Sequence, residues 1–230
     1  LNLGRLDEDK TTINQIRNYA KNTAVEVSYV FNNFGSTGNR TVYAVADPRF
    51  ASVTGRHLFV EMPDDNFRPR VSDQRVGYFS QRVTDMSTYD NYPARDLVNK
   101  WRLVKKDPDA EMSEPVEPIV FWVEKSTPEE IKPMVVKGIE AWNLAFERAG
   151  FKNAIVAKIQ ADDAEWDAGD VQYNVVRWAS FPEPSYSGYG PSIANPRTGE
   201  LIAADIVQTF AAIKRGYNLR KLWGWTPEND

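Results

Sequence analysis

The sequence of 230 residues contains no cysteine and only one histidine, His57. Without cysteine the chain cannot hold a disulfide scaffold, a cysteine-ligated zinc site, an iron–sulfur cluster or a thiol nucleophile. A zinc site with two or three histidine ligands cannot be built from His57 alone. We therefore expect no catalytic residue within this chain, and no metal site of the kinds that depend on cysteine or histidine.

Long apolar runs and an excess of positive charge are also lacking. Ile119–Val123 is among the longest apolar runs, and it is far shorter than the roughly 20 residues that cross a bilayer, so no membrane span is expected. Lys and Arg number 28 against 32 Asp and Glu, which gives a formal net charge of −4. Nonspecific nucleic-acid binding needs a basic surface, so nucleic acid is not an expected partner. Seven Trp, ten Tyr and eleven Phe indicate a chain that folds around a core.

The first half of the sequence has the pattern of a series of strands. Alternating β-branched and aromatic residues mark them, and turn-forming residues separate them. The predicted strands are Ala24–Phe31, Thr41–Ala46, His57–Met62, Arg75–Val83 and Val98–Val104. Their spacing indicates an antiparallel β domain over residues 1–112. Ahead of them, Ile13 and Ile16 predict a short helix over Glu8–Ala20, because they would share one of its faces.

The composition changes at Asp107–Pro118, where three prolines and five acidic residues leave little to bury. We predict a linker there and a second domain over residues 113–230. Its elements follow one another as a strand, a helix and three further strands, which indicates a mixed sheet with one long helix packed on it. The strands are predicted at Ile119–Glu124, Ala154–Ile159, Val171–Trp178 and Leu201–Val207, with a last helix at about 206–215. The fold class of the whole chain is α+β.

The long helix has the clearest pattern in the sequence. Thr127, Pro128 and Glu130 together form a capping box with proline at the first helical position. The apolar residues that follow at three- and four-residue spacing are Ile131, Val135, Ile139, Trp142, Phe146 and Ala149. Gly150 stands where a glycine ends a helix. The pattern predicts one helix from Thr127 to Ala149, bent near Pro133.

An acidic loop, Asp162–Asp170, is the candidate metal site. Asp163, Glu165 and Asp167 have the one-three-five spacing of a calcium-binding EF-hand loop. Its glycine comes one position late, at Gly169, and its twelfth position is an asparagine where that loop needs a glutamate. Two hypotheses remain: a calcium site, or a solvated loop between strands, which is the commoner meaning of such a charge run.

Met62–Arg70 mixes acids, arginines and an aromatic residue. Such a segment can form an arginine–carboxylate network that fixes an extended stretch against another domain. The more frequent alternative is a structured loop whose surface ion pairs contribute little energy. His57, at the start of a strand pattern, is more often a hydrogen-bonded residue than a ligand. No serine has a G-x-S-x-G context, and the glycines of Ser187–Gly190 form no phosphate-binding pattern.

Gly188–Asn195 is predicted to pair with Leu201–Val207 around a turn at Pro196–Gly199. If Tyr189–Ala194 lies at a sheet edge, its unpaired backbone groups can add an extended peptide as a further strand. The alternative is an edge that Pro191 blunts and that binds nothing. The candidate substrate-binding residues are Tyr189, Gly190, Pro191, Ser192, Ile193 and Ala194.

Five long stretches of the sequence are specific enough to compare with a known family. They are M-P-D-D-N-F-R-P-R-V-S-D-Q-R-V-G-Y-F, W-R-L-V-K-K-D-P, E-P-I-V-F-W-V-E, G-I-E-A-W-N-L-A-F-E-R-A-G-F-K-N-A and G-Y-G-P-S-I-A-N-P-R-T-G-E-L-I-A-A-D-I. Together they resemble a bacterial family of zinc-dependent metalloproteases, metzincin-like enzymes with an N-terminal domain of unknown function. The resemblance runs from roughly residue 1 to residue 215.

The resemblance implies that residues 113–230 are the upper half of a metzincin-like catalytic domain. In that family the zinc-binding helix, H-E-x-x-H-x-x-G-x-x-H/N/D, follows the segment that matches Gly188–Val207, and this chain stops at Asp230 without it. Zinc and the general base would then belong to the longer parent protein, and residues 1–230 would be inactive by themselves. The implied partners are a peptide or protein substrate and the C-terminal remainder of the polypeptide. The implied location is secreted or periplasmic.

The resemblance also implies a role for each of three segments. Thr127–Ala149 would be the helix that backs the sheet, Tyr189–Ala194 the edge strand above the substrate cleft, and Leu201–Val207 the strand that leads to the missing active-site helix. The absence of the other half would leave an exposed apolar patch, self-association or a poorly ordered tail after about Lys214.

Two other hypotheses remain beside the protease fragment. The chain could be a peptide-binding module without any protease context, which uses the edge Tyr189–Ala194. Residues 1–112 could instead have a structural or pro-domain-like role, with Met62–Phe79 lying across the cleft of a full-length enzyme.

Overall fold

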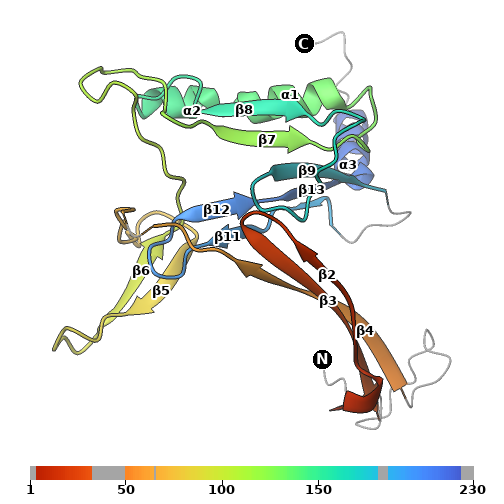
Figure 1. The fold of residues 1–230 in the computed structure, drawn as a ribbon. Coiled ribbons are helices and arrows are strands. Elements are labelled where there is room, and N and C mark those ends of the chain that lie inside the picture. The colour runs from red at the N-terminus through yellow and green to blue at the C-terminus, as the bar shows by residue number, and fades with distance from the viewer. Residues whose placement is uncertain (1–3, 33–49, 65, 181–185, 224–230) are drawn as a thin grey trace. The chain divides into compact units, whose positions relative to one another are not determined.

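The computed structural model describes residues 4–32, 50–64, 66–180 and 186–223. It contains two compact units, Leu1–Glu61 and Met62–Asp230 (Figure 1). Strands predominate over helices, so the fold is a β-rich α+β fold, as predicted. The predicted domain boundary at residues 112 and 113, with its linker at 107–118, stays a prediction.

The first unit is an antiparallel sheet built around one long strand, β3 (Asn22–Asn32). β3 pairs on one side with β1 (Arg5–Leu6) and β2 (Thr12–Asn18), and on the other side with β4 (Phe50–Val60). A short 3-10 helix, η1 (Glu8–Lys10), joins β1 to β2. The antiparallel pairing of this part of the chain is confirmed.

The predicted helix over Glu8–Ala20 is wrong, because these residues form η1 and β2. Ile13 and Ile16 do share a face, but they share it on a strand, each opposite a valine of β3. The register shifts between Ile13 and Gln15, and such an irregularity adds one residue to the strand. Side chains three positions apart therefore point to the same side without any helical turn.

The other strand predictions of the first half have different outcomes. Ala24–Phe31 is confirmed within β3, and His57–Met62 is confirmed as far as Val60. Thr41–Ala46 lies outside the described residues.

A two-stranded antiparallel hairpin, β5 (Ser80–Thr84) with β6 (Ala94–Val98), begins the strands of the second unit. The predicted strand Arg75–Val83 starts too early, because the backbone N–H of Arg75 donates to the carboxylate of Asp73 in a turn. The predicted strand Val98–Val104 is wrong except for Val98 itself. The residues after Val98 lie outside the β5–β6 hairpin, and Lys100 makes an isolated bridge to Glu200.

A five-stranded mixed sheet forms the centre of the second unit (Figure 1). Its strand order is β10-β13-β9-β7-β8. The bounds are β7 (Ile119–Val123), β8 (Ile155–Ile159), β9 (Asn174–Ala179), β10 (Gly188–Tyr189) and β13 (Ile206–Thr209). The pairs from β13 to β8 are parallel, and β10 is antiparallel at the edge. A separate antiparallel ladder pairs β11 (Ser192–Ala194) with β12 (Leu201–Ala204).

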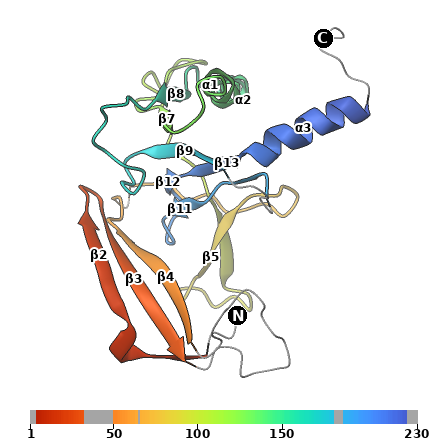
Figure 2. The same ribbon diagram turned by 90° about the vertical axis from the view of Figure 1, so that its right-hand side faces the viewer.

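Two consecutive helices, α1 (Lys132–Glu140) and α2 (Asn143–Arg148), replace the single predicted helix. Figure 2 shows them nearly end-on, beside β7 and β8. The buried core between α1 and the sheet consists of Ile119, Phe121, Val123, Val135, Ile139, Ile155 and Val176. Between the two helices, Ala141 and Trp142 keep right-handed helical backbone angles, but the N–H groups of Trp142 and Leu144 donate to carbonyl oxygens three residues back instead of four. The side-chain amide of Asn143 bonds to both backbone groups of Ile155, at 2.9 and 3.1 Å. This contact attaches the start of α2 to the start of β8.

The start of the helix also differs from the prediction. α1 begins at Lys132, and no side-chain hydrogen bond caps it, so the predicted capping box is wrong. Thr127 is buried instead, and its N–H donates to the carbonyl oxygen of Glu124 at 3.0 Å in the turn after β7. Pro133 lies in the first helical turn, where its missing N–H leaves no hydrogen bond unmade. Gly150, with a φ of +83°, ends α2 as predicted.

The last described element is α3 (Phe210–Leu222), which follows β13 directly. The first residues of the helix predicted at 206–215 belong to β13, because they pair with β9. The helix then continues past Lys214 to Leu222, which contradicts a poorly ordered tail over that stretch. Of the helices that the structure describes, none has the length and apolar character needed to cross a membrane.

Candidate functional site

The predicted site residues lie on one arm of an irregular antiparallel hairpin, and residues 201–209 form its other arm. The register pairs Gly188 with Gln208, Tyr189 with Val207, Ser192 with Ala204 and Ile193 with Ala203. Between the two ladders, the N–H of Asp205 donates to the carbonyl oxygen of Pro191 at 3.0 Å. The predicted pairing around the turn at Pro196–Gly199 is therefore confirmed.

The predicted strand Tyr189–Ala194 is divided between two ladders. Tyr189 ends β10 in the five-stranded sheet, whereas Ser192–Ala194 form β11 and pair with β12. Gly190 and Pro191 lie between the two strands. The ladder is interrupted there because proline has no N–H to donate.

Along residues 187–191, the backbone N–H and C=O groups point alternately toward β13 and toward the side of β10 that faces away from β13. The carbonyl oxygen of Ser187 accepts from the N–H of Thr209 at 3.2 Å, and that of Pro191 accepts from Asp205. Hydrogen-bonded residues in an antiparallel pair recur at every second position. Ser187, Tyr189 and Pro191 therefore direct their backbone groups toward β13.

Gly188 and Gly190 direct their N–H and C=O groups away from β13, since they alternate with those residues. β10 is the last strand of its sheet, and no strand among the described residues pairs with its outer side. Both glycines are exposed. Sequence reasoning included Gly190 in the site and missed Gly188, because only the strand register shows which backbone groups face outward.

The side chains along this arm differ in exposure. Tyr189 is 63% exposed and Ser192 is exposed, while Pro191, Ile193 and Ala194 are half-buried. No bulky apolar residue of the arm is fully buried, so the arm is accessible along its length.

An apolar groove of about 1010 Å³ lies between α1 and the sheet, beside β10. Its walls include Met134, Gly138, Trp142, Trp178, Ile206 and Tyr189. The side chains of Met134 and Trp142 are exposed. The exposed apolar patch that the sequence predicts is therefore present on the second unit.

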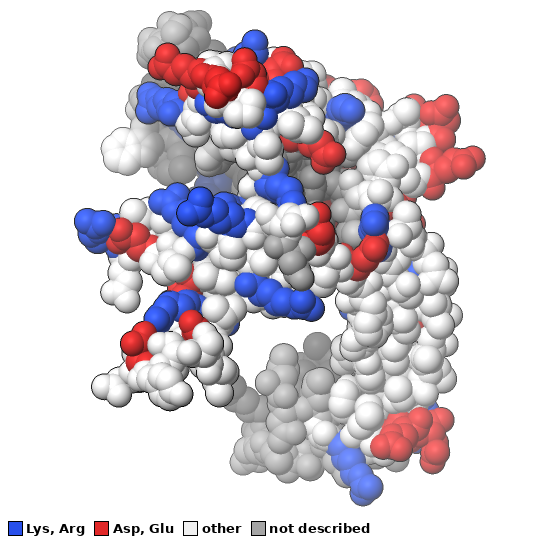
Figure 3. Space-filling model, turned by 60° about the vertical axis from the view of Figure 1, so that its left-hand side comes forward, with Lys and Arg blue, Asp and Glu red and all other residues white. Residues whose placement is uncertain are grey.

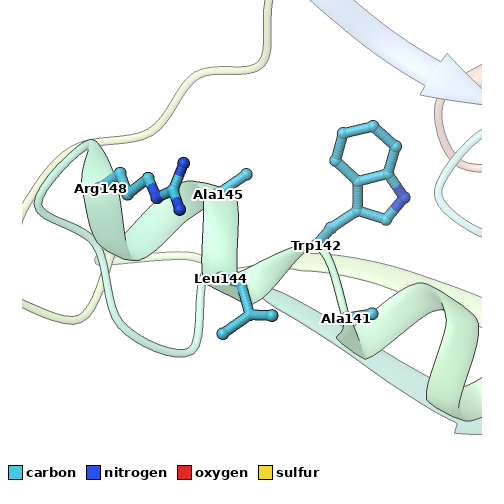
Figure 4. A pocket seen from close by; sticks show the side chains of 5 residues that line it. All are labelled: Ala141, Trp142, Leu144, Ala145 and Arg148. Carbon is cyan, nitrogen blue, oxygen red and sulfur yellow. The ribbon is translucent and has the colours of Figure 1, made fainter.

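A smaller hollow, of about 410 Å³, lies at the break between α1 and α2 (Figure 4). It is lined by Ala141, Trp142, Leu144, Ala145 and Arg148. Figure 4 shows the side chains of Trp142 and Leu144 pointing away from one another. The hollow is open and its only charged group is Arg148, so it brings no reactive groups together.

The carboxylates of the acidic loop are used in local turns. Asp167 Oδ1 accepts the N–H of Gly169 at 2.6 Å, and Asp170 Oδ1 accepts that of Gln172 at 3.0 Å. In the described part of the chain, no three His, Asp or Glu side chains form a group that could hold a metal ion. These hydrogen bonds stabilise turns within the loop, and the calcium site stays a hypothesis.

Met62–Arg70 takes part in an arginine–carboxylate network. From the sequence, such a network is one of two hypotheses, and a structured loop with weak surface ion pairs is the more frequent of them. Arg102 donates from Nη2 to Asp64 at 2.8 Å, and from Nε and Nη2 to Glu200 at 2.5 and 3.0 Å. Glu200 is buried. The hydrogen bond from Arg102 is the largest cause that lowers the pKa of Asp64 below its ordinary value.

Oppositely charged side chains lie next to one another at several places on the surface (Figure 3). Exposed pairs of this kind are Arg75 with Asp73 at 2.6 Å and Arg82 with Asp96 at 2.9 Å. Exposed pairs contribute little to stability. The pair of Arg102 with the buried Glu200 differs from them, because a buried carboxylate that loses its partner is costly.

His57 is an exposed residue of β4 whose Nε2 forms a hydrogen bond with the hydroxyl of Tyr29. Its ring also lies edge-on to the ring of Tyr29, with 5.8 Å between the centroids. This contact agrees with the prediction of a hydrogen-bonded histidine.

Comparison with known protein families gives a match over part of the chain. Residues 1–106 match the family model of a domain of unknown function, DUF5117. No curated protein and no solved structure matches the chain. The matched segment extends beyond the first compact unit, and it therefore supplies Asp64 and Arg102 to the second unit.

Proposed function

We propose that this chain is part of a zinc-dependent metalloendopeptidase, in which it supplies the N-terminal domain and the upper rim of the substrate cleft. Zinc bound elsewhere in that protein would supply an activated water for peptide hydrolysis. None of the described residues is assigned to the metal, because they contain no suitable ligand group. The resemblance on which this proposal draws also suggests a secreted or periplasmic protein.

The open edge of β10 is the observation that supports this proposal most. An extended peptide that lies antiparallel to β10 can exchange hydrogen bonds with the outward N–H and C=O groups of Gly188 and Gly190. Such bonds hold the main chain in one position and so orient the peptide bond that is to be cut. They do not depend on the peptide's side chains, and we expect broad specificity.

The arrangement around β10 also supports the proposal. α1 and α2 lie against the sheet where the resemblance expects a backing helix, although they are two helices. The apolar groove between α1 and the sheet is a surface suited to packing against further protein. We assign it to the C-terminal remainder of the same polypeptide.

A peptide-binding module without protease activity is the second candidate function. The same edge supports it, since β-strand addition needs nothing beyond Gly188, Gly190 and the strand that carries them.

The test uses the longest polypeptide that the gene encodes around residues 1–230. Casein cleavage is measured before chelation, after chelation and after zinc is restored. We expect cleavage that chelation abolishes and zinc restores, and no cleavage by residues 1–230 alone. A folded longer polypeptide that binds casein peptides without cutting them would favour the binding module. Zinc-dependent cleavage by residues 1–230 alone would contradict the division of labour proposed here.

A further inference from the structure

Most of the turn between the two arms of the hairpin is buried, although turns are normally exposed, and only Pro196 and Arg197 are exposed there. Asn195, Thr198 and Glu200 are only 1%, 7% and 5% exposed. Asn195 organises the turn itself: its Oδ1 accepts the N–H of Arg197 at 2.9 Å, and its carbonyl oxygen accepts that of Gly199 at 2.8 Å. Something must cover a turn that contains three buried polar residues.

The extended residues after β6 cover it. The N–H of Lys100 donates to the carbonyl oxygen of Gly199 at 3.0 Å, and the carbonyl oxygen of Lys100 accepts the N–H of Leu201 at 2.9 Å. Lys100 thereby forms a parallel bridge with Glu200. This single bridge attaches the backbone after β6 to the start of β12.

Side chains reinforce this backbone contact. The guanidinium of Arg102 binds both oxygens of Glu200 and also reaches Asp64. Phe67 is buried, and the Lys100 ammonium and the Arg102 guanidinium lie 4.6 and 5.6 Å from the centre of its ring. Two segments that lie far from the hairpin in the sequence are therefore attached to its turn.

We propose that these residues, Lys100 and Arg102 with Asp64 and Phe67, form a brace that holds the hairpin and so fixes the open edge at Gly188 and Gly190. All of them lie within the matched domain of unknown function. The inference gives part of that domain a role: it positions the peptide-binding edge. Arg102 is a positioning residue, because it acts through Glu200 and touches no peptide. That the brace holds the hairpin does not depend on the proposed function, whereas its effect on catalysis rests on that function.

Arg102→Ala leaves the buried Glu200 carboxylate without its partner, so the hairpin should open more often. Hydrogen exchange followed by mass spectrometry on residues 1–230 measures this opening. We expect at least tenfold faster exchange over residues 187–209, with β7 and β8 unchanged. The matched control is Arg82→Ala, which removes an arginine from an exposed pair of the same unit and should leave residues 187–209 unchanged.

Two further variants test the brace if Arg102→Ala does not fold. Arg102→Lys retains the charge but cannot make the paired hydrogen bonds to Glu200, and it should speed exchange in the same region by a smaller factor. Glu200→Gln combined with Arg102→Ala removes the unpaired buried charge and should restore part of the protection. Exchange at the wild-type rate over residues 187–209 in a folded Arg102→Ala or Arg102→Lys variant overturns the brace.

The catalytic consequence is measured in the longer polypeptide. We expect Arg102→Lys to raise KM for casein peptides severalfold with little change in kcat, since the brace positions the edge and does not touch the reacting atoms. Unchanged KM despite faster exchange overturns the role of the brace in substrate binding. If the wild-type polypeptide cleaves nothing, the proposed protease function fails, and the exchange measurement still decides whether the brace exists.

Discussion

The carbonyl oxygen of Val98 lies 2.5 Å from the position that a Cβ atom on Gly199 would occupy. Gly199 also has a φ of +75°, in the left-handed region that side chains disfavour. The hairpin turn can therefore approach the end of β6 only with glycine at this position.

Gly199→Ala should lower the free energy of unfolding by about 2–5 kcal/mol. The left-handed conformation costs about 1–2 kcal/mol for alanine, and the displaced backbone of Val98 adds a strain of about 1–3 kcal/mol. Urea denaturation followed by fluorescence measures the loss. Gly138→Ala is the matched control: Gly138 lies inside α1 with nothing within 4 Å of a Cβ, so alanine should stabilise the protein by up to about 1 kcal/mol. Equal losses in both variants would contradict the argument.

Asn143→Ala should destabilise the second unit by about 1–3 kcal/mol, because the N–H and C=O of Ile155 both lose their side-chain partner. Thermal and urea denaturation measure the effect. Asn218→Ala, at an exposed position of α3, should change stability by only a few tenths of a kcal/mol, in the stabilising direction. An Asn143→Ala variant as stable as the wild type would show that the hydrogen bonds between Asn143 and Ile155 do not stabilise the second unit.

The carboxyl group of Asp205 should make the free energy of unfolding depend on pH. Burial raises the pKa of its carboxyl above the ordinary value of 3.8, against the opposing effects of the Val175 N–H and Arg177, while Glu124 adds to the increase. Between 3.8 and the raised pKa, the folded protein binds more protons than the unfolded chain. This group therefore stabilises the fold as the pH falls through that window. The stability advantage of Asp205→Asn over the wild type should shrink from pH 7 toward pH 4.

Asp96→Asn is the control of opposite sign. The hydrogen bond from Arg82 lowers the pKa of Asp96, so its contribution is present at neutral pH and is lost in acid. Urea denaturation at both pH values measures the two differences. We expect Asp205→Asn to be more stable than the wild type at pH 7 and Asp96→Asn to be less stable. Stability differences of the same sign for both variants would contradict the direction assigned to one of the two pKa shifts.

Calcium should leave the melting temperature unchanged at millimolar concentration. The carboxylates of Asp167 and Asp170 accept backbone hydrogen bonds within their own turns, and in the described part of the chain no three acidic side chains form a group that could hold a metal ion. A calcium-dependent rise in melting temperature that Asp163→Asn abolishes would restore the calcium hypothesis.

The sequence predicted correctly those strands and turns whose residue pattern lies within a few neighbouring positions. The alternation in β3, the apolar run of β7 and the P-R-T-G turn of the hairpin each appear within a few residues of the sequence, and each is confirmed. The helix prediction over Glu8–Ala20 failed for a local reason too, since a strand irregularity at β2 has the same three-residue spacing as a helix.

Contacts between distant residues could not be predicted in the same way. Arg102 and Glu200 are 98 positions apart, and nothing near either residue indicates the other. The contact of Asn143 with Ile155 forms only after the chain has turned back, so no local pattern indicates it. Gly188 was missed because the outward direction of its backbone follows from the register with β13.

The most direct test of the peptide-binding edge is amide hydrogen exchange by NMR on residues 1–230, with and without an excess of unstructured casein peptides. The N–H groups of Gly188 and Gly190 face the open side, whereas that of Tyr189 already faces β13. We predict that bound peptide slows exchange at Gly188 and Gly190 and leaves Tyr189 unchanged. Peptide binding that protects neither glycine, or that protects Tyr189 alone, would contradict the account.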